Sequence, residues 1–177
     1  MMAVSKAITS GYGPLAALVM DREYGSLLPS STVRKTNGAD MRSLAAAKAV
    51  IERLRGIEKR LIPEDIDADL KEELEQGLLA TFSTKEESLK YKLVSMKDEF
   101  PLFGDLRGSG LIWSLDVVDI QGKLDHEACA IIQKALLERG VLVRDVRGAL
   151  LFKVPITFTD DDLQQGFKII EEYLRSR

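Results

Sequence analysis

The sequence predicts an α/β protein whose chain ends in a small α+β domain. Three features lead to this class. Residues 15–20 form an apolar run of strand length, the middle of the chain repeats apolar residues at helical spacing, and the last third alternates strand-like and helix-like segments. A chain of 177 residues corresponds to one domain, or to one domain with part of another. It can bury roughly 70% of its unfolded surface, which is enough for a core.

The first twenty residues predict the end of a strand, a turn and a second strand. Residues 10–14 combine serine, glycine and proline, which is typical of a turn. Residues 15–20 contain no polar side chain, and strands this apolar are usually covered on both faces. Because so little of this sequence precedes that strand, we expect one of its covers to lie on a segment outside the sequence.

The middle of the chain predicts a loop and then a helix. Residues 26–40 are rich in serine, threonine and other loop-forming residues. A helix is expected over residues 41–61, with Asp40 as its N-cap and Pro63 as its stop. Apolar residues recur there at helical spacing, at Leu44, Ala47, Ile51, Leu54 and Ile57.

The remainder of the chain predicts a second helical region and then a layer of strands and helices. The helical region is expected over residues 64–98, with an interruption at residues 81–84. The later elements are expected as a strand over residues 111–118, a helix capped by Asp125 and closed by Gly140, a strand over residues 141–143, a turn at Arg147 and Gly148, a strand over residues 149–154, and a final helix begun by a capping box at residues 159–162. This order indicates a compact α+β layer.

Composition and single residues exclude several classes of function. The formal net charge is −3 without a basic block, so we expect no nucleic-acid binding. The longest apolar run is far shorter than the roughly 20 residues that span a membrane. His126 is the only histidine; we interpret it as a first-turn helix residue and expect no metal site. Cys129, the only cysteine, is expected to be an inert buried thiol. With no disulfide and no signal-peptide pattern, we expect a cytoplasmic protein.

One lysine has a context that suggests chemistry. Lys6 lies at the expected end of the first strand, beside small residues that let a ligand approach the backbone closely. An amine in such a place can attack a carbonyl carbon to form a Schiff base. Most lysines are solvated surface residues, and the residues around Lys6 do not by themselves decide between the two interpretations.

Several segments, in order and at similar spacing, resemble class III aminotransferases. Residues 5–17 (SKAITSGYGPLAA) resemble the family's Schiff-base lysine segment, in which the lysine precedes a small-residue turn and Pro-Leu-Gly-Ala; Ala16 stands where that glycine is usual. Residues 100–111 resemble the segment that enters the family's C-terminal domain. Residues 137–144 resemble its next helix and strand, and residues 154–160 resemble the stretch before its terminal helix. The resemblance covers essentially the whole chain.

The resemblance implies a C-terminal piece of the aspartate-aminotransferase-like transferase fold (fold type I), which binds pyridoxal 5′-phosphate (PLP). Residues 1–62 would be a remnant of the large cofactor-binding domain, and residues 63–177 the small C-terminal α+β domain. Lys6 would bind PLP as a Schiff base and move a proton between substrate and cofactor. A threonine before the first long helix would bind the PLP phosphate of the partner subunit in a homodimer. Its ungapped position is Thr36, and Thr32 is the alternative if the loop contains a gap.

Two departures from the family's pattern bear on phosphate and substrate binding. The family has Gly-Asn-Pro after that threonine, where this chain has Ala39, Asp40 and Met41; the charge of Asp40 opposes a phosphate unless it points away. Many members have a substrate-carboxylate arginine at the position of Leu151. Lys153, two residues later on the same face of a strand, could bind a carboxylate as a point charge. Amines, ω-amino acids and amino acids all stay open as substrates.

The resemblance implies an aminotransferase that moves an amino group between an amine or amino acid and a 2-oxo acid. The cofactor-ring contacts and the phosphate loop that the family has before its lysine are not in this sequence. We therefore expect the partner to be a second copy or a separately encoded N-terminal half. Two alternatives stay open: a non-catalytic fragment or assembly module of the same fold, and an aminomutase or racemase that uses the same lysine and cofactor.

Overall fold

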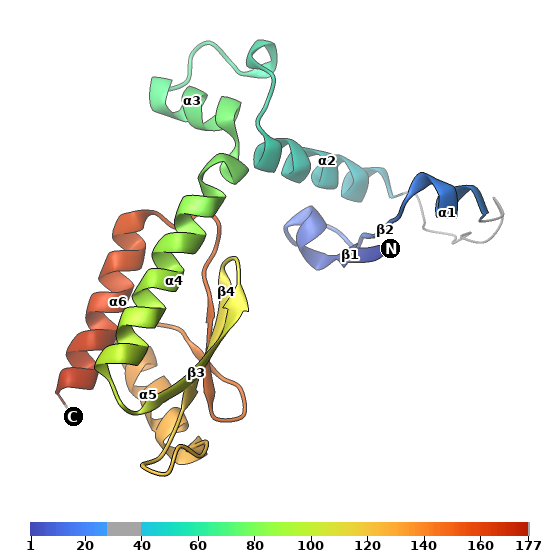
Figure 1. The fold of residues 1–177 in the computed structure, drawn as a ribbon. Coiled ribbons are helices and arrows are strands. Elements are labelled where there is room, and N and C mark those ends of the chain that lie inside the picture. Colours follow the sequence, from blue (N-terminus) through green and yellow to red (C-terminus); the bar gives the residue numbers. More distant parts are fainter. Residues whose placement is uncertain (28–39, 177) are drawn as a thin grey trace. The chain divides into compact units, whose positions relative to one another are not determined.

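The computed structural model describes residues 1–27 and 40–176, which divide into two compact units, Met1–Ala80 and Thr81–Arg177 (Figure 1). The domain boundary expected after residue 62 falls inside the first unit. Hydrogen bonds join the chain on both sides of that position: the amide of Ile57 donates to the carbonyl oxygen of Leu74 at 2.8 Å. The chain therefore folds back after its first long helix instead of leaving the unit there.

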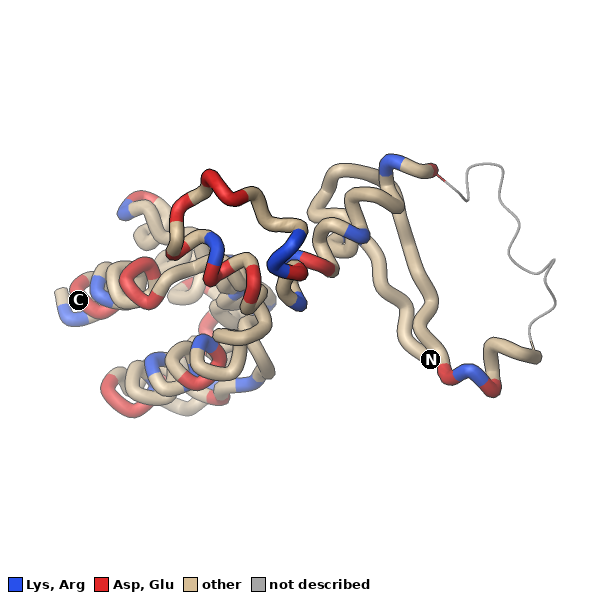
Figure 2. Tube along the Cα trace, turned by 90° about the horizontal axis from the view of Figure 1, so that it is seen from above, with Lys and Arg blue, Asp and Glu red and all other residues tan. Residues whose placement is uncertain are grey.

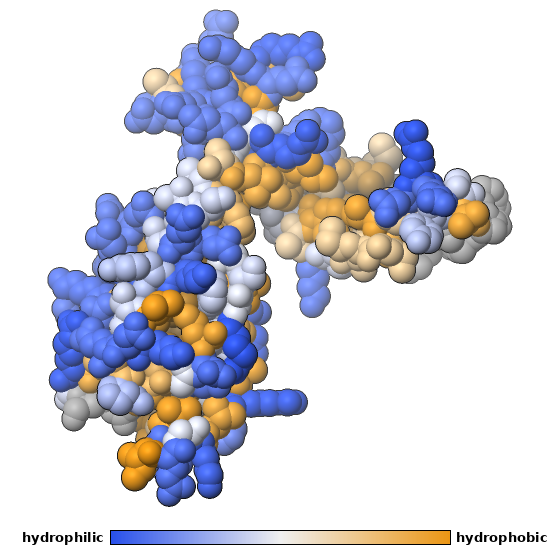
Figure 3. All heavy atoms as spheres, in the orientation of Figure 1, coloured by the Kyte–Doolittle hydropathy of each residue, from blue (hydrophilic) through white to orange (hydrophobic). Residues whose placement is uncertain are grey.

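The first unit begins with an antiparallel pair of strands, β1 (Met2–Ser5) and β2 (Ala16–Val19). The short 3₁₀ helix η1 (Lys6–Thr9) and a turn connect them, close to the expected arrangement. The expected burial of β2 is wrong for the described part of the chain, since Leu18 and Val19 are 53% and 51% exposed. Within that part β2 pairs with β1 alone, so its apolar side chains contribute to the apolar surface of this unit (Figure 3).

The two longer helices of the first unit end where the backbone requires glycine. After α1 (Arg22–Leu27), which was not predicted, α2 runs over Met41–Arg55 and ends at Gly56, short of the expected residue 61. Gly56 has a φ of +99°, and a Cβ there would lie 3.1 Å from the carbonyl carbon of Glu75. A non-glycine residue is strained at such a φ, so the helix cannot continue through this point.

The second helical region is divided at Gly77, before the predicted interruption at residues 81–84. The 3₁₀ turn η2 (Lys59–Leu61) and α3 (Ala68–Gln76) belong to the first unit, η3 (Leu78–Thr81) follows Gly77, and α4 (Phe82–Glu99) belongs to the second unit. Gly77 has a φ of +73°, which a continuous helix does not allow. The break was expected too late, because the close approach of Gly77 to the backbone of Gly56 depends on tertiary structure.

The second unit contains a four-stranded antiparallel sheet in the order β3-β4-β6-β5. Its elements after α4 are β3 (Phe103–Ser109), β4 (Ile112–Val117), α5 (His126–Glu138), β5 (Arg144–Asp145), β6 (Ala149–Lys153) and α6 (Asp160–Arg175). The Asp125 cap and the Thr159–Asp162 capping box are confirmed. The strand expected over residues 141–143 is wrong, because pairing with β6 begins only at Arg144. No strand was predicted at β3, where glycines interrupt the apolar alternation.

The core of the second unit lies on one face of this sheet, against α4, α5 and α6. Its fully buried residues include Leu93 from α4, Leu115 from β4 and Leu136 from α5. Phe152 and Phe167 stack with ring centroids 6.1 Å apart, which joins β6 to α6. Burial of one such side chain stabilises the fold by about 1.5–3 kcal/mol. Acidic and basic residues alternate along the helices instead of gathering in one block (Figure 2), and none of the described helices is long and apolar enough to cross a membrane.

Candidate functional site

Lys6 occupies a strained backbone position directly after β1. Its φ is 52°, in the left-handed region that residues other than glycine rarely adopt. Ser5 before it is extended, so the chain reverses direction at Lys6 and enters η1. A non-glycine residue in this conformation costs on the order of 1–3 kcal/mol, and such residues concentrate at functional sites. The Lys6 side chain is exposed.

A cavity of about 430 Å³ opens beside Lys6. It is lined by Ser5, Lys6, Ala7, Gly11, Gly13, Pro14 and Leu15. These small side chains leave the backbone accessible to a ligand. The primary amine of Lys6 fits the aldehyde carbon of PLP, since an amine and an aldehyde form a Schiff base. Within this described lining there is no aromatic ring, no carboxylate and no second cation. The lining therefore fits the attachment point of the cofactor, and its ring and phosphate would need other residues.

The loop that contains Lys6 is held from inside by Thr9, which is fully buried. The Thr9 hydroxyl lies 2.7 Å from the carbonyl oxygen of Gly13 and 3.3 Å from that of Lys6. The amide of Tyr12 donates to the carbonyl oxygen of Thr9 at 3.0 Å. Sequence reasoning treated this threonine only as part of a small-residue segment. Its burial was not visible without the tertiary structure.

The start of α2 is capped by Asp40. Its carboxylate accepts hydrogen bonds from the amides of Arg42 and Ser43, at 3.3 and 3.2 Å, and from the Ser43 hydroxyl. The Ser43 hydroxyl is the main cause that lowers the pKa of Asp40. These first-turn amides are therefore engaged by the chain's own carboxylate, which bears on the expectation that a phosphate binds near this helix. Thr32 and Thr36, the threonines expected to bind it, lie outside the described residues.

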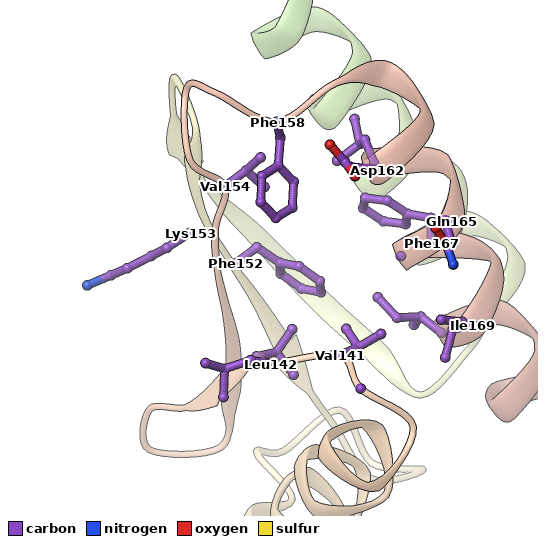
Figure 4. Close-up of a pocket in the computed structure, with 15 residues that line it drawn as sticks. Val141, Leu142, Phe152, Lys153, Val154, Phe158, Asp162, Gln165, Phe167 and Ile169 are labelled. Carbon is purple, nitrogen blue, oxygen red and sulfur yellow. The ribbon is translucent and has the colours of Figure 1, made fainter.

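Lys153 lies at the end of β6, with its side chain directed away from the apolar core (Figure 4). Leu151 pairs with Arg144 across β5 and with Ser114 across β4. Residues paired in an antiparallel ladder share a face, so Arg144 lies on the same face as Leu151 and Lys153. Sequence reasoning missed Arg144, because it assigned a strand to residues 141–143 and therefore had no register for the strand pair.

A second cavity of about 430 Å³ lies between β6, α6 and the segment before β5. Its lining is mainly apolar, with Phe152, Phe158 and Phe167 directed into it (Figure 4). The Lys153 side chain points out of this space. Apart from Lys153, the lining contains no nucleophile, and the one carboxylate on it, Asp162, is engaged in the capping box. We assign no chemistry to this cavity.

The single cysteine and the single histidine behave as expected from the sequence. Cys129 is fully buried in the core of the second unit. Burial, and next a hydrogen bond with Asp145, raise the pKa of its thiol to about 12, so it is protonated and inert at neutral pH. His126 is the first residue of α5, directly after its N-cap. Within the described residues no cluster of three or more acidic, histidine or cysteine side chains could bind a metal ion.

Comparison with known proteins assigns the family. The sequence matches the family model of aminotransferase class-III over residues 1–174, and the chain belongs to this family. It is 28% identical over 170 residues to a mitochondrial acetylornithine aminotransferase of Candida glabrata, covering 95% of this chain and 33% of that protein. It is 24% identical over 176 residues to an (R)-1-hydroxy-2-aminoethylphosphonate ammonia-lyase of Vibrio splendidus, covering 97% and 33%.

Solved structures share the fold. An acetylornithine aminotransferase from Elizabethkingia anophelis superposes with a TM-score of 0.73 and 19% identity, covering 99% of this chain and 40% of that one. A transaminase from the marine bacterium Virgibacillus has a TM-score of 0.72 and 20% identity, with coverage of 99% and 38%. The chain thus has part of the transaminase α/β fold, and it spans about a third of the length of the curated relatives that it matches.

Proposed function

We propose that this chain is the lysine-bearing part of a PLP-dependent aminotransferase, which moves an amino group between an amine or amino acid and a 2-oxo acid. One observation carries the proposal. In a chain that matches the class III family over residues 1–174, Lys6 has a strained φ of 52° and lines a cavity built from small residues. The rare backbone conformation and the small-residue cavity together support a functional role for this lysine.

The role proposed for Lys6 has two parts. Its amine attaches the cofactor, and after the substrate amine takes that place, the freed amine accepts a proton from the substrate carbon and returns it at another position. PLP, when bound, supplies the electron sink for this chemistry. The exposed position of Lys6 at the start of η1 leaves its side chain free to move between these two tasks.

The remaining contacts to the cofactor are proposed to come from two sources. Thr36, or Thr32 if the loop contains a gap, would bind the phosphate of a partner subunit in a homodimer. The contacts to the ring would come from residues outside this sequence, on a separately encoded N-terminal half. The exposed apolar side chains of β2 support this, because contiguous apolar surface of this kind marks protein contacts.

A substrate carboxylate is proposed to bind the open face of the second unit's sheet. Lys153 and Arg144 are exposed there, on the same face as Leu151. Arg144 lies directly opposite Leu151, and Lys153 lies two residues further along β6, so the two cations are diagonal neighbours about 7–8 Å apart at the backbone. This spacing suits one carboxylate held between them.

The test is a titration of the purified chain with PLP, followed by borohydride reduction and peptide mapping. We expect an absorbance band of the protonated Schiff base and a reduced adduct at Lys6. Lys6→Arg is the matched control, because it keeps the charge and cannot form the adduct. If the adduct is absent, or spreads over surface lysines in both proteins, the non-catalytic alternative holds for the isolated chain.

A second reaction is supported by the range of relatives. A leucine/methionine racemase of Thermococcus litoralis is 27% identical over 175 residues, covering 97% of this chain and 35% of that protein. This identity is close to that of the aminotransferases, so a racemase reaction with the same lysine is the alternative. Incubation of the assembled enzyme with one amino-acid enantiomer and no 2-oxo acid separates them: only a racemase would turn over and produce the other enantiomer.

A further inference from the structure

The left-handed backbone conformation of Lys6 needs contacts that keep it in place. A left-handed lysine relaxes to an ordinary conformation unless the surrounding structure fixes it. Two contacts meet at this loop. Thr9 binds it from within, and Ser43 on α2 packs against it from outside. Both residues are fully buried, although most residues of this unit are exposed.

The first contact is the Thr9 hydroxyl. It has one proton to donate and two carbonyl acceptors, Gly13 at 2.7 Å and Lys6 at 3.3 Å. With one proton, these contacts are two branches of a single bifurcated hydrogen bond: the shorter ties the end of the turn to η1, and the longer reaches the carbonyl of the strained residue itself. Valine has the same shape without the hydroxyl, so it would leave both carbonyls without this donor.

The second contact is the close approach of Gly13 to Ser43. A Cβ on Gly13 would overlap the Ser43 hydroxyl oxygen and lie 3.1 Å from the Ser43 Cβ. The φ of Gly13 is not in the left-handed region, so this glycine is required for space and not for conformation. Ser43 is fixed in turn by its hydrogen bonds to the Asp40 carboxylate. Gly13 is therefore held between Thr9 and α2.

We infer that Thr9 is a positioning residue: its hydroxyl, with Gly13 seated on Ser43, holds Lys6 in the left-handed conformation that presents its amine to the cavity. Thr9 touches the backbone of Lys6 and not the reacting atoms. The importance of this positioning for catalysis rests on the proposed function. The effect of Thr9 on the backbone conformation of Lys6 does not rest on it, because that conformation is present in the chain without cofactor.

The first test compares Thr9→Val with Thr9→Ser in the full chain. The one-bond Cα–Hα coupling of Lys6, measured with ¹³C-labelled lysine, distinguishes positive from negative φ in the absence of PLP. We expect Thr9→Val to shift this coupling and Thr9→Ser to retain it. With PLP and borohydride, Thr9→Val should lower the adduct at Lys6 about fivefold relative to exposed Lys90, the effect of losing one hydrogen bond.

The second test uses the close approach. Gly13→Ala should disturb the Lys6 coupling and lower the Lys6 adduct. Ser43→Gly added to it should restore both, since it removes the two atoms nearest to the new methyl group, the Ser43 hydroxyl oxygen and Cβ. The fluorescence of Trp113 reports unfolding of the second unit and serves as the control. It should be the same in these variants and in the wild type if only the first unit is affected. This pair keeps the test valid if Thr9→Val fails to fold.

The outcomes separate the two proposals. An unchanged Lys6 coupling in Thr9→Val, or equal losses in Thr9→Val and Thr9→Ser, would overturn the positioning role even if the wild-type chain forms the PLP adduct. A coupling that changes in Thr9→Val and returns in Thr9→Ser supports the positioning role. If the wild-type chain then forms no adduct at Lys6, the non-catalytic alternative holds for the isolated chain and the backbone role of Thr9 stands.

Discussion

Gly56 and Gly77 meet backbone to backbone at the point where the chain folds back between α2 and α3. A Cβ on Gly77 would overlap the amide nitrogen of Gly56 and lie 2.5 Å from the carbonyl carbon of Arg55. Both glycines have positive φ. This contact closes the helical part of the first unit, so the two helix ends are fixed by one another.

Gly77→Ala should therefore destabilise the first unit. The substitution meets backbone atoms that cannot move aside and a φ of +73°, so we expect a loss of more than about 1 kcal/mol. Gly166→Ala is the matched control: Gly166 lies inside α6 with no atom within 4 Å of its added Cβ. It should stabilise the helix by up to about 1 kcal/mol. Urea unfolding measures both, and equal effects would contradict the close approach.

The capping box of α6 makes stability depend on pH. Backbone and side-chain hydrogen bonds from Thr159 lower the pKa of Asp162. A lowered folded-state pKa contributes stability above the unfolded pKa, and this contribution is lost as the pH falls through the folded value. Asp162→Asn should remove this part of the acid sensitivity, whereas Asp161→Asn, a first-turn neighbour, should retain it. Unfolding between pH 7 and pH 2 measures the difference, and identical pH profiles would exclude the effect.

Thr159→Ala should lower stability by about 1 kcal/mol at neutral pH. The substitution removes the hydroxyl that accepts from the Asp162 amide at 3.1 Å, which leaves a first-turn amide without its cap. Thermal unfolding of the second unit measures the loss. Thr157→Ala, an exposed neighbour before the helix, is the control and should change the midpoint little; an equal loss there would show that the cap is not the cause.

Two adjacent leucines on α5 should differ in their contribution to stability. Leu136 is fully buried and Leu137 is 52% exposed. Leu136→Ala should destabilise the second unit by about 2–5 kcal/mol, because it removes buried methyl groups and leaves a cavity. Leu137→Ala should cost far less. Chemical unfolding of the two variants measures the two losses of stability. Similar losses would mean that the buried face of α5 is wrongly assigned.

Cys129 should be unreactive in the folded chain. Burial raises the pKa of its thiol to about 12, so the thiolate that reacts with disulfide reagents is nearly absent at pH 8. We expect slow labelling in the native protein and fast labelling in denaturant. Because Cys129 is the only cysteine, one absorbance trace reports it. Rapid labelling of the native chain would show that α5 opens readily.

Local interactions account for what was predicted correctly. Asp40, Asp125 and the Thr159–Asp162 pair were identified as helix starts because a cap depends on side chains within three residues of the helix end. The apolar spacing in α5 and α6 reflects the face that each presents to the core. The family resemblance, too, depends on short segments read in order, and it led to Lys6.

The sequence alone thus determined the starts of α2, α5 and α6, the strand–helix order of the second unit from β4 onward, and the family. Only the tertiary structure decided where α2 and α3 end, that residues 103–109 pair as a strand, and that Arg144 lies opposite Leu151. It also decided that Thr9 is buried beneath Lys6. The physical reason is the same in each case. Close backbone approach, strand register and burial depend on residues distant in the chain, and no window of neighbouring residues contains them.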